Sequence, residues 1–148
     1  MMTPTSAQHS HVSRARTLRA RGLAVAGAAA ATTAVWALAS PFAGLDVRLD
    51  PGHAAQHVGA VTAAVITVLA GLAGWALLTA FERLAARPPR RSWTITAVVV
   101  LVVSLAGPLG AGTTTSTKVA LACMHLAAAA VLIPALASTA QARKRPDE

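Results

Sequence analysis

The segment VGAVTAAVITVLAGLAGWALLTA, residues 58–80, decides the fold because it carries no charged side chain. An α-helix rises about 1.5 Å per residue, so about 20 apolar residues cross the ~30 Å hydrocarbon core of a bilayer. No water is available there to satisfy backbone groups, and the segment lacks the alternating pattern that a membrane β-barrel needs. Residues 58–80 therefore predict a transmembrane helix.

Three further blocks without Asp, Glu, Lys or Arg lie at residues 22–40, 93–109 and 119–138. The whole chain is 55% hydrophobic and 12% charged, whereas roughly 25% of the residues are charged in an average soluble domain. The second helix is expected to begin early, because Asp50 can cap it and Pro51 suits the first helical position. The predicted fold is all-α, an antiparallel bundle of four transmembrane helices at about residues 22–40, 51–84, 92–109 and 117–138.

The basic residues are distributed unequally between the two predicted ends of the bundle. The net charge is +8, and eleven of the thirteen Lys and Arg residues lie before the first helix, between the second and third, or after the fourth. Only Arg48 and Lys118 fall in the other two loops. Because basic loops stay on the cytoplasmic side, this bias predicts a multi-pass protein of the bacterial plasma membrane with both termini in the cytoplasm.

This orientation divides the chain into three parts. We expect residues 1–21 to form a disordered basic cytoplasmic tail, residues 22–140 the four-helix domain, and residues 141–148 a charged cytoplasmic tail. The arginines lie next to predicted spans and no aromatic stacking platform accompanies them, so a nucleic-acid partner is not expected. Their expected partners are anionic lipid headgroups at the cytoplasmic face of the bilayer.

The first apolar block also resembles a secretory signal peptide, since it has a basic start and ends in the small-x-small sequence Ala37-Leu38-Ala39. Its apolar part is longer than the roughly 7–15 residues of a signal peptide, and Trp36 stands where an interfacial anchor of a true span would stand. An uncleaved transmembrane helix is therefore the favoured interpretation.

A histidine lies deep in the fourth predicted span. At about 1.5 Å per residue, His125 is roughly 12 Å from the helix start near Thr117, and an ionisable residue at that depth is a functional candidate. The favoured interpretation is structural: a neutral imidazole that hydrogen-bonds to a hydroxyl group on another helix, the candidates being Thr62, Thr67 and Ser104. Haem ligation and a proton relay each need a second suitable group at similar depth, and the spans supply none.

Two alternatives to a structural role remain open, and the first is a small-molecule binder or transporter. Its pocket would be formed by His125, Cys123 and the helix break around Pro108. Pro134 marks another irregular point in the fourth helix, because a proline leaves the carbonyl four residues earlier without its helical partner.

The second alternative is a metal-responsive membrane protein that uses His53 and His57. These histidines are four residues apart, on one face of the expected first turns of the second helix. Together with a carboxylate from Asp46 or Asp50 they form a set that can bind zinc. No third firm ligand accompanies them, so a solvated helix end is favoured and we expect no metal or other cofactor.

Five parts of the sequence, within about residues 20–140, are similar to a known family. They are Trp36, GLD at 44–46, LAGLAGWALL at 69–78, WTITAVVVLVVSLAGPLG at 93–110 and MHLAAAAVLIP at 124–134. The order of these stretches resembles a family of small actinobacterial four-helix membrane proteins classed as a domain of unknown function. The resemblance implies a plasma-membrane protein of four helices, and it implies no activity.

The sequence shows no paired carboxylates within a span, no nucleophile with a nearby base and no cofactor fingerprint. Little of the chain is left outside the predicted spans. We therefore expect a non-enzymatic structural or interaction protein that associates, within the membrane, with itself or with another membrane protein.

Overall fold

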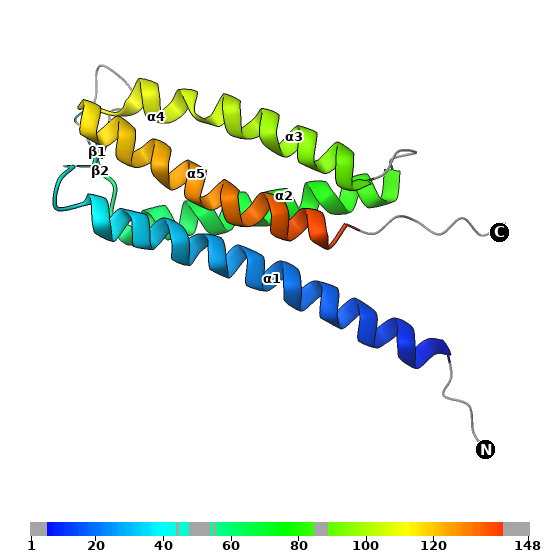
Figure 1. The fold of residues 1–148 in the computed structure, drawn as a ribbon. Coiled ribbons are helices and arrows are strands. Elements are labelled where there is room, and N and C mark those ends of the chain that lie inside the picture. The colour runs from blue at the N-terminus through cyan, green and yellow to red at the C-terminus, as the bar shows by residue number, and fades with distance from the viewer. Residues whose placement is uncertain (1–5, 44, 48–53, 55, 85–88, 141–148) are drawn as a thin grey trace.

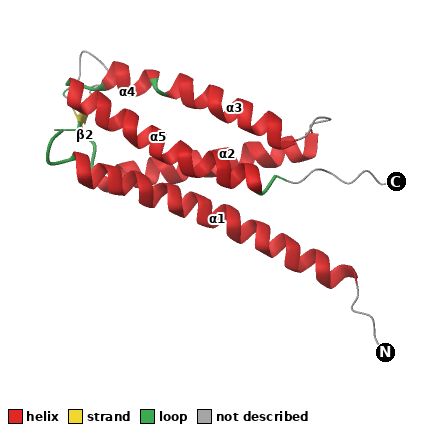
Figure 2. Cartoon of the chain, in the orientation of Figure 1, coloured by secondary structure: helices red, strands yellow, loops and turns green. Residues whose placement is uncertain are grey.

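The computed structural model describes residues 6–43, 45–47, 54, 56–84 and 89–140. In these ranges the chain forms five helices and two short strands (Figures 1 and 2), namely α1 (Ser6–Ala39), β1 (Asp46–Val47), β2 (Gln56–His57), α2 (Ala60–Leu84), α3 (Pro89–Ser104), α4 (Ala106–Ala111) and α5 (Thr115–Ser138). Four stretches of helix are long and apolar enough to cross a membrane: Ala15–Ala39, Ala60–Leu84, Arg90–Ala111 and Thr115–Ser138. The predicted all-α fold with four such helices is confirmed.

The third span is divided, because α3 ends at Ser104 and α4 begins at Ala106. Pro108 lies four residues after Ser104, and a proline has no N–H to donate to the carbonyl four residues earlier. Pro108 is buried against the rest of the molecule. The break expected in this region from the sequence is therefore present, and α4 continues α3 toward the same end of the molecule (Figure 1).

The first helix begins earlier than predicted. The expectation of a disordered tail is wrong for residues 6–21, since α1 starts at Ser6 and runs without a break into the first span. Residues 6–21 contain no proline, and seven of these sixteen residues are Ala or Arg, which are good helix formers. Figure 1 shows the first turns of α1 extending beyond the other helices.

The second helix begins later than predicted. Residues 48–53, which include the expected start at Asp50 and Pro51, lie outside the described residues, but Gln56 and His57 form a strand and α2 starts only at Ala60. The backbone N–H and carbonyl of Val58, which a helix starting earlier would use, are bonded to residues outside α2. The Val58 N–H donates to the Leu45 carbonyl at 2.9 Å, and the Trp36 Nε1–H donates to the Val58 carbonyl at 2.7 Å.

Strands β1 and β2 form an antiparallel pair that joins the loops at one end of the bundle. Asp46 lies opposite His57, and Val47 forms a bridge to Gly112 in the link between α4 and α5. Thr113 strengthens this link, because its backbone N–H and its hydroxyl both donate to the Asp46 carbonyl, at 3.3 and 2.9 Å. We call this end, with β1, β2 and residues 112–114, the hairpin end.

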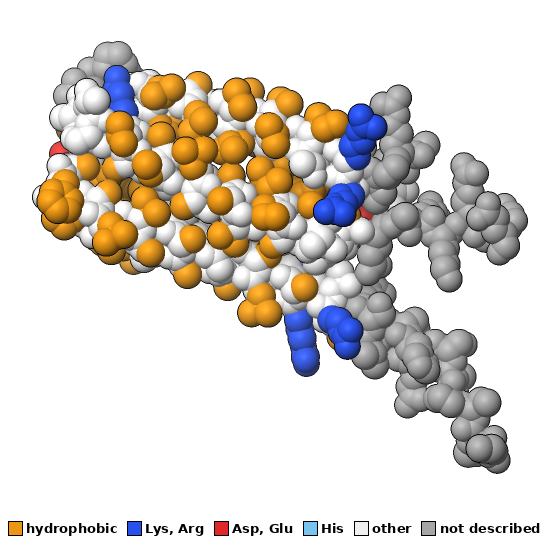
Figure 3. Space-filling model, in the orientation of Figure 1, with side chains coloured by type: hydrophobic (Ala, Val, Ile, Leu, Met, Phe, Trp, Pro, Cys, Tyr) orange, Lys and Arg blue, Asp and Glu red, His pale blue; other side chains and the backbone are white. Residues whose placement is uncertain are grey.

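The opposite end of the molecule carries the arginines, and we call it the basic end. The start of the first span, the end of α2, the start of α3 and the end of α5 meet there (Figure 1). Among the side chains that the structure describes, the exposed basic residues at this end are Arg16, Arg19, Arg83, Arg90 and Arg91. Between the two ends, hydrophobic side chains cover the visible face of the bundle (Figure 3), as a lipid solvent requires.

Glycines allow the helices to approach closely in the core. A Cβ atom added at Gly71 of α2 would lie 3.1 Å from both methyl groups of Val25 in α1, and one at Gly74 would lie 3.1 Å from the indole of Trp93 in α3. Such close backbone approach is the usual basis of helix packing in membranes, where the hydrophobic effect gives helices no preference for one another over lipid. Gly71 and Gly74 thus bring α1 and α3 onto α2.

Candidate functional site

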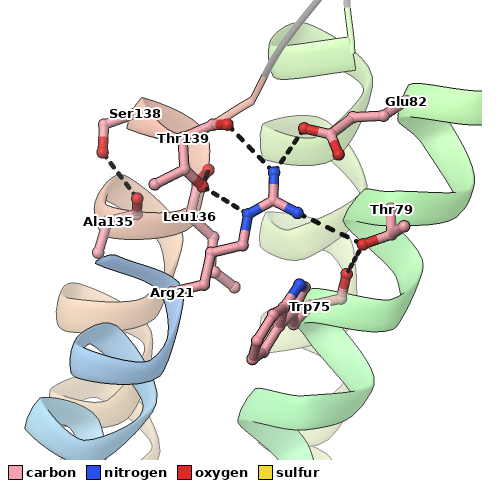
Figure 4. Close-up of polar contacts among 8 residues, drawn as sticks. All are labelled: Arg21, Trp75, Thr79, Glu82, Ala135, Leu136, Ser138 and Thr139. Carbon is pink, nitrogen blue, oxygen red and sulfur yellow. Dashed lines mark hydrogen bonds and ion pairs between the residues drawn. The ribbon is translucent and has the colours of Figure 1, made fainter. Parts of the chain in front are cut away.

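A polar cluster at the basic end is centred on Arg21, whose side chain is only 5% exposed. Its guanidinium group donates four hydrogen bonds (Figure 4). Nε donates to the Thr139 hydroxyl at 3.0 Å and Nη1 to the Thr79 hydroxyl at 3.4 Å. Nη2 donates to Glu82 Oε1 at 2.5 Å and to the Thr139 carbonyl at 3.1 Å. All three nitrogens of the guanidinium are engaged.

Three elements supply the groups of this cluster. Arg21 belongs to α1, while Thr79 and Glu82 lie three residues apart on one face of α2. Thr139 is the residue that caps the C-terminus of α5. The cluster therefore ties α1, α2 and α5 together at one point near the edge of the apolar region.

The two threonine hydroxyls are oriented to accept from the arginine. The Thr79 hydroxyl donates to the Trp75 carbonyl at 2.9 Å, and the Thr139 hydroxyl donates to the Leu136 carbonyl at 2.9 Å. Because a hydroxyl has one proton and two lone pairs, each threonine directs its lone pairs at the guanidinium once its proton is engaged. Each hydroxyl thus connects its own helix to Arg21.

The electrostatic surroundings favour a cation at this position. The Glu82 side chain is 17% exposed and forms an ion pair with Arg21, and the carbonyl end of α5 carries the negative end of a helix dipole. Taking a guanidinium out of water is costly unless its charge and its N–H groups are matched. Here Glu82 offsets the charge and four hydrogen bonds engage the N–H groups. The arrangement acts as a joint between three helices.

This joint was not predicted from the sequence, in which Arg21 is one of several basic residues before the first span. Two signals point to it. Arg21 shares a helix face with the buried residues Ala24, Ala28 and Thr32, at spacings of three and four. Glu82 is the only acidic residue between Asp50 and Asp147.

His125 does not make the bond that was expected of it. Its Nδ1 lies 2.9 Å from the Leu121 carbonyl, one turn earlier in the same helix, and its side chain is half-buried. The hydroxyl of Thr67, one of the expected partners, donates to Ala63 in its own helix. Ser104 likewise donates to Leu101 of α3, and the third expected partner, Thr62, is exposed. His125, Thr67 and Ser104 each form a hydrogen bond within their own helix, because a carbonyl three or four residues earlier is always within reach there.

Among the described residues, the groove that Cys123 lines does not include His125 or Pro108, the other two residues of the expected pocket. Cys123 and His125 are two residues apart, and at about 100° per residue their side chains leave α5 in nearly opposite directions. Cys123 is exposed and faces a groove between α1 and α5, whereas Pro108 is buried in α4. Pro134 is exposed on α5, away from all of them in sequence.

The expected metal ligands are only partly within the described residues. His57 Nδ1 lies 3.2 Å from Asp46 Oδ1 across the strand pair, with both side chains about half exposed. His53 and Asp50 lie outside the described residues, and His57 is in a strand rather than on a helix face. The part of the chain that the structure describes contains no group of three His, Cys, Asp or Glu side chains arranged to hold a metal ion.

The sequence of the chain also matches a known protein family. The sequence profile of a family of unknown function, DUF6069, matches residues 12–142. The chain belongs to the DUF6069 family. The DUF6069 match extends over α1 from Val12 onward and over all the later helices, and so includes both Arg21 and Glu82. No curated protein and no solved structure matches the chain.

Proposed function

We propose that this DUF6069 member is a multi-pass protein of the bacterial plasma membrane that has a structural, non-enzymatic role. In this proposal it associates within the bilayer with a second copy of itself or with another membrane protein. The observation that carries the proposal is the distribution of side chains: four apolar helices side by side, with charges only at their ends. The actinobacterial origin implied by the resemblance belongs to the same proposal.

The orientation rests on the two ends of the bundle. Among the described side chains, the basic end carries five exposed arginines in addition to Arg21, and the hairpin end carries Lys118 as its only Lys or Arg. By the positive-inside rule the basic end lies in the cytoplasm, where its arginines meet anionic lipid headgroups. Both ends of the chain are then cytoplasmic and the strand pair lies on the outer side.

Helix α3 offers the surface for association. In the most apolar part of its span only 6% of the residues are buried, against 28% in α5. Its exposed side chains are mostly β-branched and therefore stiff, which lowers the entropy that is lost when a partner helix packs on them. The exposed β-branched side chains are Ile95, Val98, Val99, Val100, Val102 and Val103.

The orientation is tested with reporter fusions. A fluorescent protein fused after Glu148 is expected to fluoresce, and alkaline phosphatase inserted after Thr114 is expected to be active. Phosphatase activity at the C-terminus with none after Thr114 contradicts the orientation. Release of the chain from membranes by alkaline carbonate contradicts membrane insertion itself.

The association is tested by native mass spectrometry of the chain released directly from membrane patches. We expect a defined dimer or a complex with one other membrane protein. Val99→Trp and Val103→Trp are expected to abolish it, while Leu69→Trp on the exposed face of α2 is the matched control. A monomer without bound protein contradicts the association, and so does a complex that all three substitutions weaken equally. A specific turnover by the purified protein contradicts the non-enzymatic role.

A further inference from the structure

Thr32 of α1 is 3% exposed, and within the described part of the chain its hydroxyl is the one buried side-chain group without a hydrogen-bond partner. The neighbouring Thr33 shows the usual arrangement, because its hydroxyl donates to the Ala29 carbonyl one turn earlier at 2.8 Å. Buried polar groups are almost always bonded to protein or to ordered water. The unbonded hydroxyl of Thr32 therefore indicates a polar partner that the described side chains do not supply.

The stripe of α1 that carries Thr32 faces both α2 and α5. Arg21 lies eleven residues, or about three turns, before Thr32, and it bonds to groups of both helices. Val25 lies seven residues before Thr32 and so shares its face. A Cβ atom at Gly71 of α2 would lie 3.1 Å from the Val25 methyl groups and 3.4 Å from Leu132 of α5. The Thr32 side chain is therefore directed at the seam between α2 and α5.

His125 lies at nearly the same depth on α5. Helices α1 and α5 run antiparallel (Figure 1), and a Cβ atom at Gly27 would lie 3.6 Å from Val131. Thr32 is five residues after Gly27, and His125 is six residues before Val131. The two levels thus agree within about one residue, or about 1.5 Å. His125 also precedes Leu132 by seven residues and so shares the face of α5 that meets α2.

Thr67 occupies the same level on α2, where it is 7% exposed. Trp36 of α1 packs against the cluster that contains Ala63 of α2. Thr32 lies four residues before Trp36, and Thr67 lies four residues after Ala63. Because α1 and α2 run in opposite directions, both threonines are one turn from this contact, toward the basic end.

The hydrogen-bonding groups of these three side chains are complementary to one water molecule. The Leu121 carbonyl can only accept, so Nδ1 of the neutral His125 ring carries the proton and Nε2 presents a lone pair. The Thr67 hydroxyl donates its proton to the Ala63 carbonyl and keeps its lone pairs. The Thr32 hydroxyl still has a proton to donate. A water molecule can donate to two acceptors and accept from one donor at the same time.

We propose that Thr32, Thr67 and His125 bind a buried water molecule in the seam between α1, α2 and α5, about 16 Å along α1 from Arg21. The water donates to His125 Nε2 and to Thr67 Oγ1, and it accepts from Thr32 Oγ1. The side chains one turn away are small, so the helices can part far enough to admit it; they are Ala28, Ala63 and Ala129. The proposal depends neither on the orientation nor on the association through α3.

The first test is the sign of the stability change in Thr32→Val, which removes the hydroxyl and keeps the shape. Loss of a water-bonded hydroxyl is expected to raise the equilibrium constant for unfolding by SDS about fivefold. An unbonded hydroxyl predicts the opposite sign, since valine removes the cost of burying it. Thr33→Val is the matched control and is expected to change the constant less than about threefold. An unchanged or lower constant in Thr32→Val, or an equal effect in both variants, overturns the proposal.

A double substitution tests the link to His125. If one water joins the two side chains, His125→Leu removes a bond that Thr32→Val has already broken. The double variant is then expected to unfold with a constant at least about threefold smaller than the product of the two single effects predicts. His125→Leu combined with Thr33→Val is the control, and its effects are expected to multiply. Single effects of Thr32→Val and His125→Leu that multiply in the same way overturn the proposal.

A further measurement does not depend on a variant that folds. The unaltered chain, labelled at His, Thr and Ala, is placed in phosphatidylglycerol bilayers, and solid-state NMR follows magnetisation transferred from water. Early transfer is expected to Thr32 and to an unprotonated Nε2 of His125, and none to Ala28, which is fully buried beside them. A protonated Nε2, or transfer to Thr32 no earlier than to Ala28, overturns the proposal. Such a failure in a chain that resists carbonate extraction leaves the proposed membrane insertion intact.

Discussion

Arg21 in α1 donates to Glu82 in α2 at 2.5 Å, across 61 positions of sequence. The pair lies at the edge of the apolar region, where two more hydrogen bonds from Arg21 reach Thr139 at the end of α5. One guanidinium group therefore determines how three of the four spans are positioned relative to one another at the basic end.

Replacement of Arg21 is expected to destabilise the bundle. Arg21→Ala removes the ion pair with the partly buried Glu82 together with the hydrogen bonds to Thr79 and Thr139, and the loss of one member of a buried ion pair costs about 3 kcal/mol. The free energy of unfolding by SDS in mixed micelles measures this effect. Arg19→Ala, an exposed arginine two residues away, is the control and is expected to change stability by less than about 0.5 kcal/mol.

Arg21→Lys separates charge from geometry at the same site. A lysine keeps the charge but lacks the planar fork that reaches Glu82, Thr79 and Thr139 together, so most of the destabilisation is expected to remain. Full stability of Arg21→Lys would contradict the role of the forked hydrogen bonds and would leave charge alone as the cause.

Glycine substitutions in two helices are expected to act in opposite directions. Gly71→Ala places a Cβ atom 3.1 Å from the Val25 methyl groups and is expected to destabilise by about 1 kcal/mol. Gly22→Ala meets nothing within 4 Å and is expected to stabilise by up to about 1 kcal/mol through its helix propensity. Thermal unfolding in one detergent compares the two. Equal effects of both changes would contradict close contact between α1 and α2 at Gly71.

Substitution of Gly112 tests the packing at the hairpin end. A Cβ atom at Gly112 would lie 2.6 Å from the Lys118 side chain and 3.1 Å from the backbone of Lys118 and Pro108. Gly112→Ala is therefore expected to displace the link that carries the bridge to Val47, at a cost of about 1–3 kcal/mol. Faster proteolysis of the loops at this end is the readout.

Gly110→Ala is the matched control for Gly112→Ala, since a Cβ atom there meets nothing within 4 Å. Its proteolysis is expected to follow that of the unaltered chain. If the two variants are cut at the same rate, the contact between Gly112 and α5 does not hold the hairpin end together.

His125 is expected to be dispensable for folding. Its observed hydrogen bond is to the Leu121 carbonyl of its own helix, so His125→Leu removes no observed hydrogen bond between the described helices and is expected to change stability by less than about 1 kcal/mol. Folded yield and unfolding in SDS measure this. A collapse of folded yield would show that the imidazole bonds to a neighbouring helix after all.

The sequence alone determined the four spans, because membrane crossing depends on length and hydropathy, and both are local and additive along the chain. Residues 58–80 and the three other apolar blocks were sufficient to predict an all-α bundle. The break near Pro108 was also predictable, since a missing N–H is a property of the residue itself.

Only the tertiary structure decided which side chains meet. Arg21 finds Glu82, and Cys123 and His125 diverge, because the rotation and depth of each helix are set by contacts such as that of Gly71 with Val25. Residues 56–59 are not helical, although the sequence had predicted a helix there, because Val58 donates to Leu45 and accepts from Trp36, distant residues that no local pattern reveals. Hydropathy predicts that a helix lies in the membrane, but the face that it turns to its neighbours depends on packing between segments far apart in the chain.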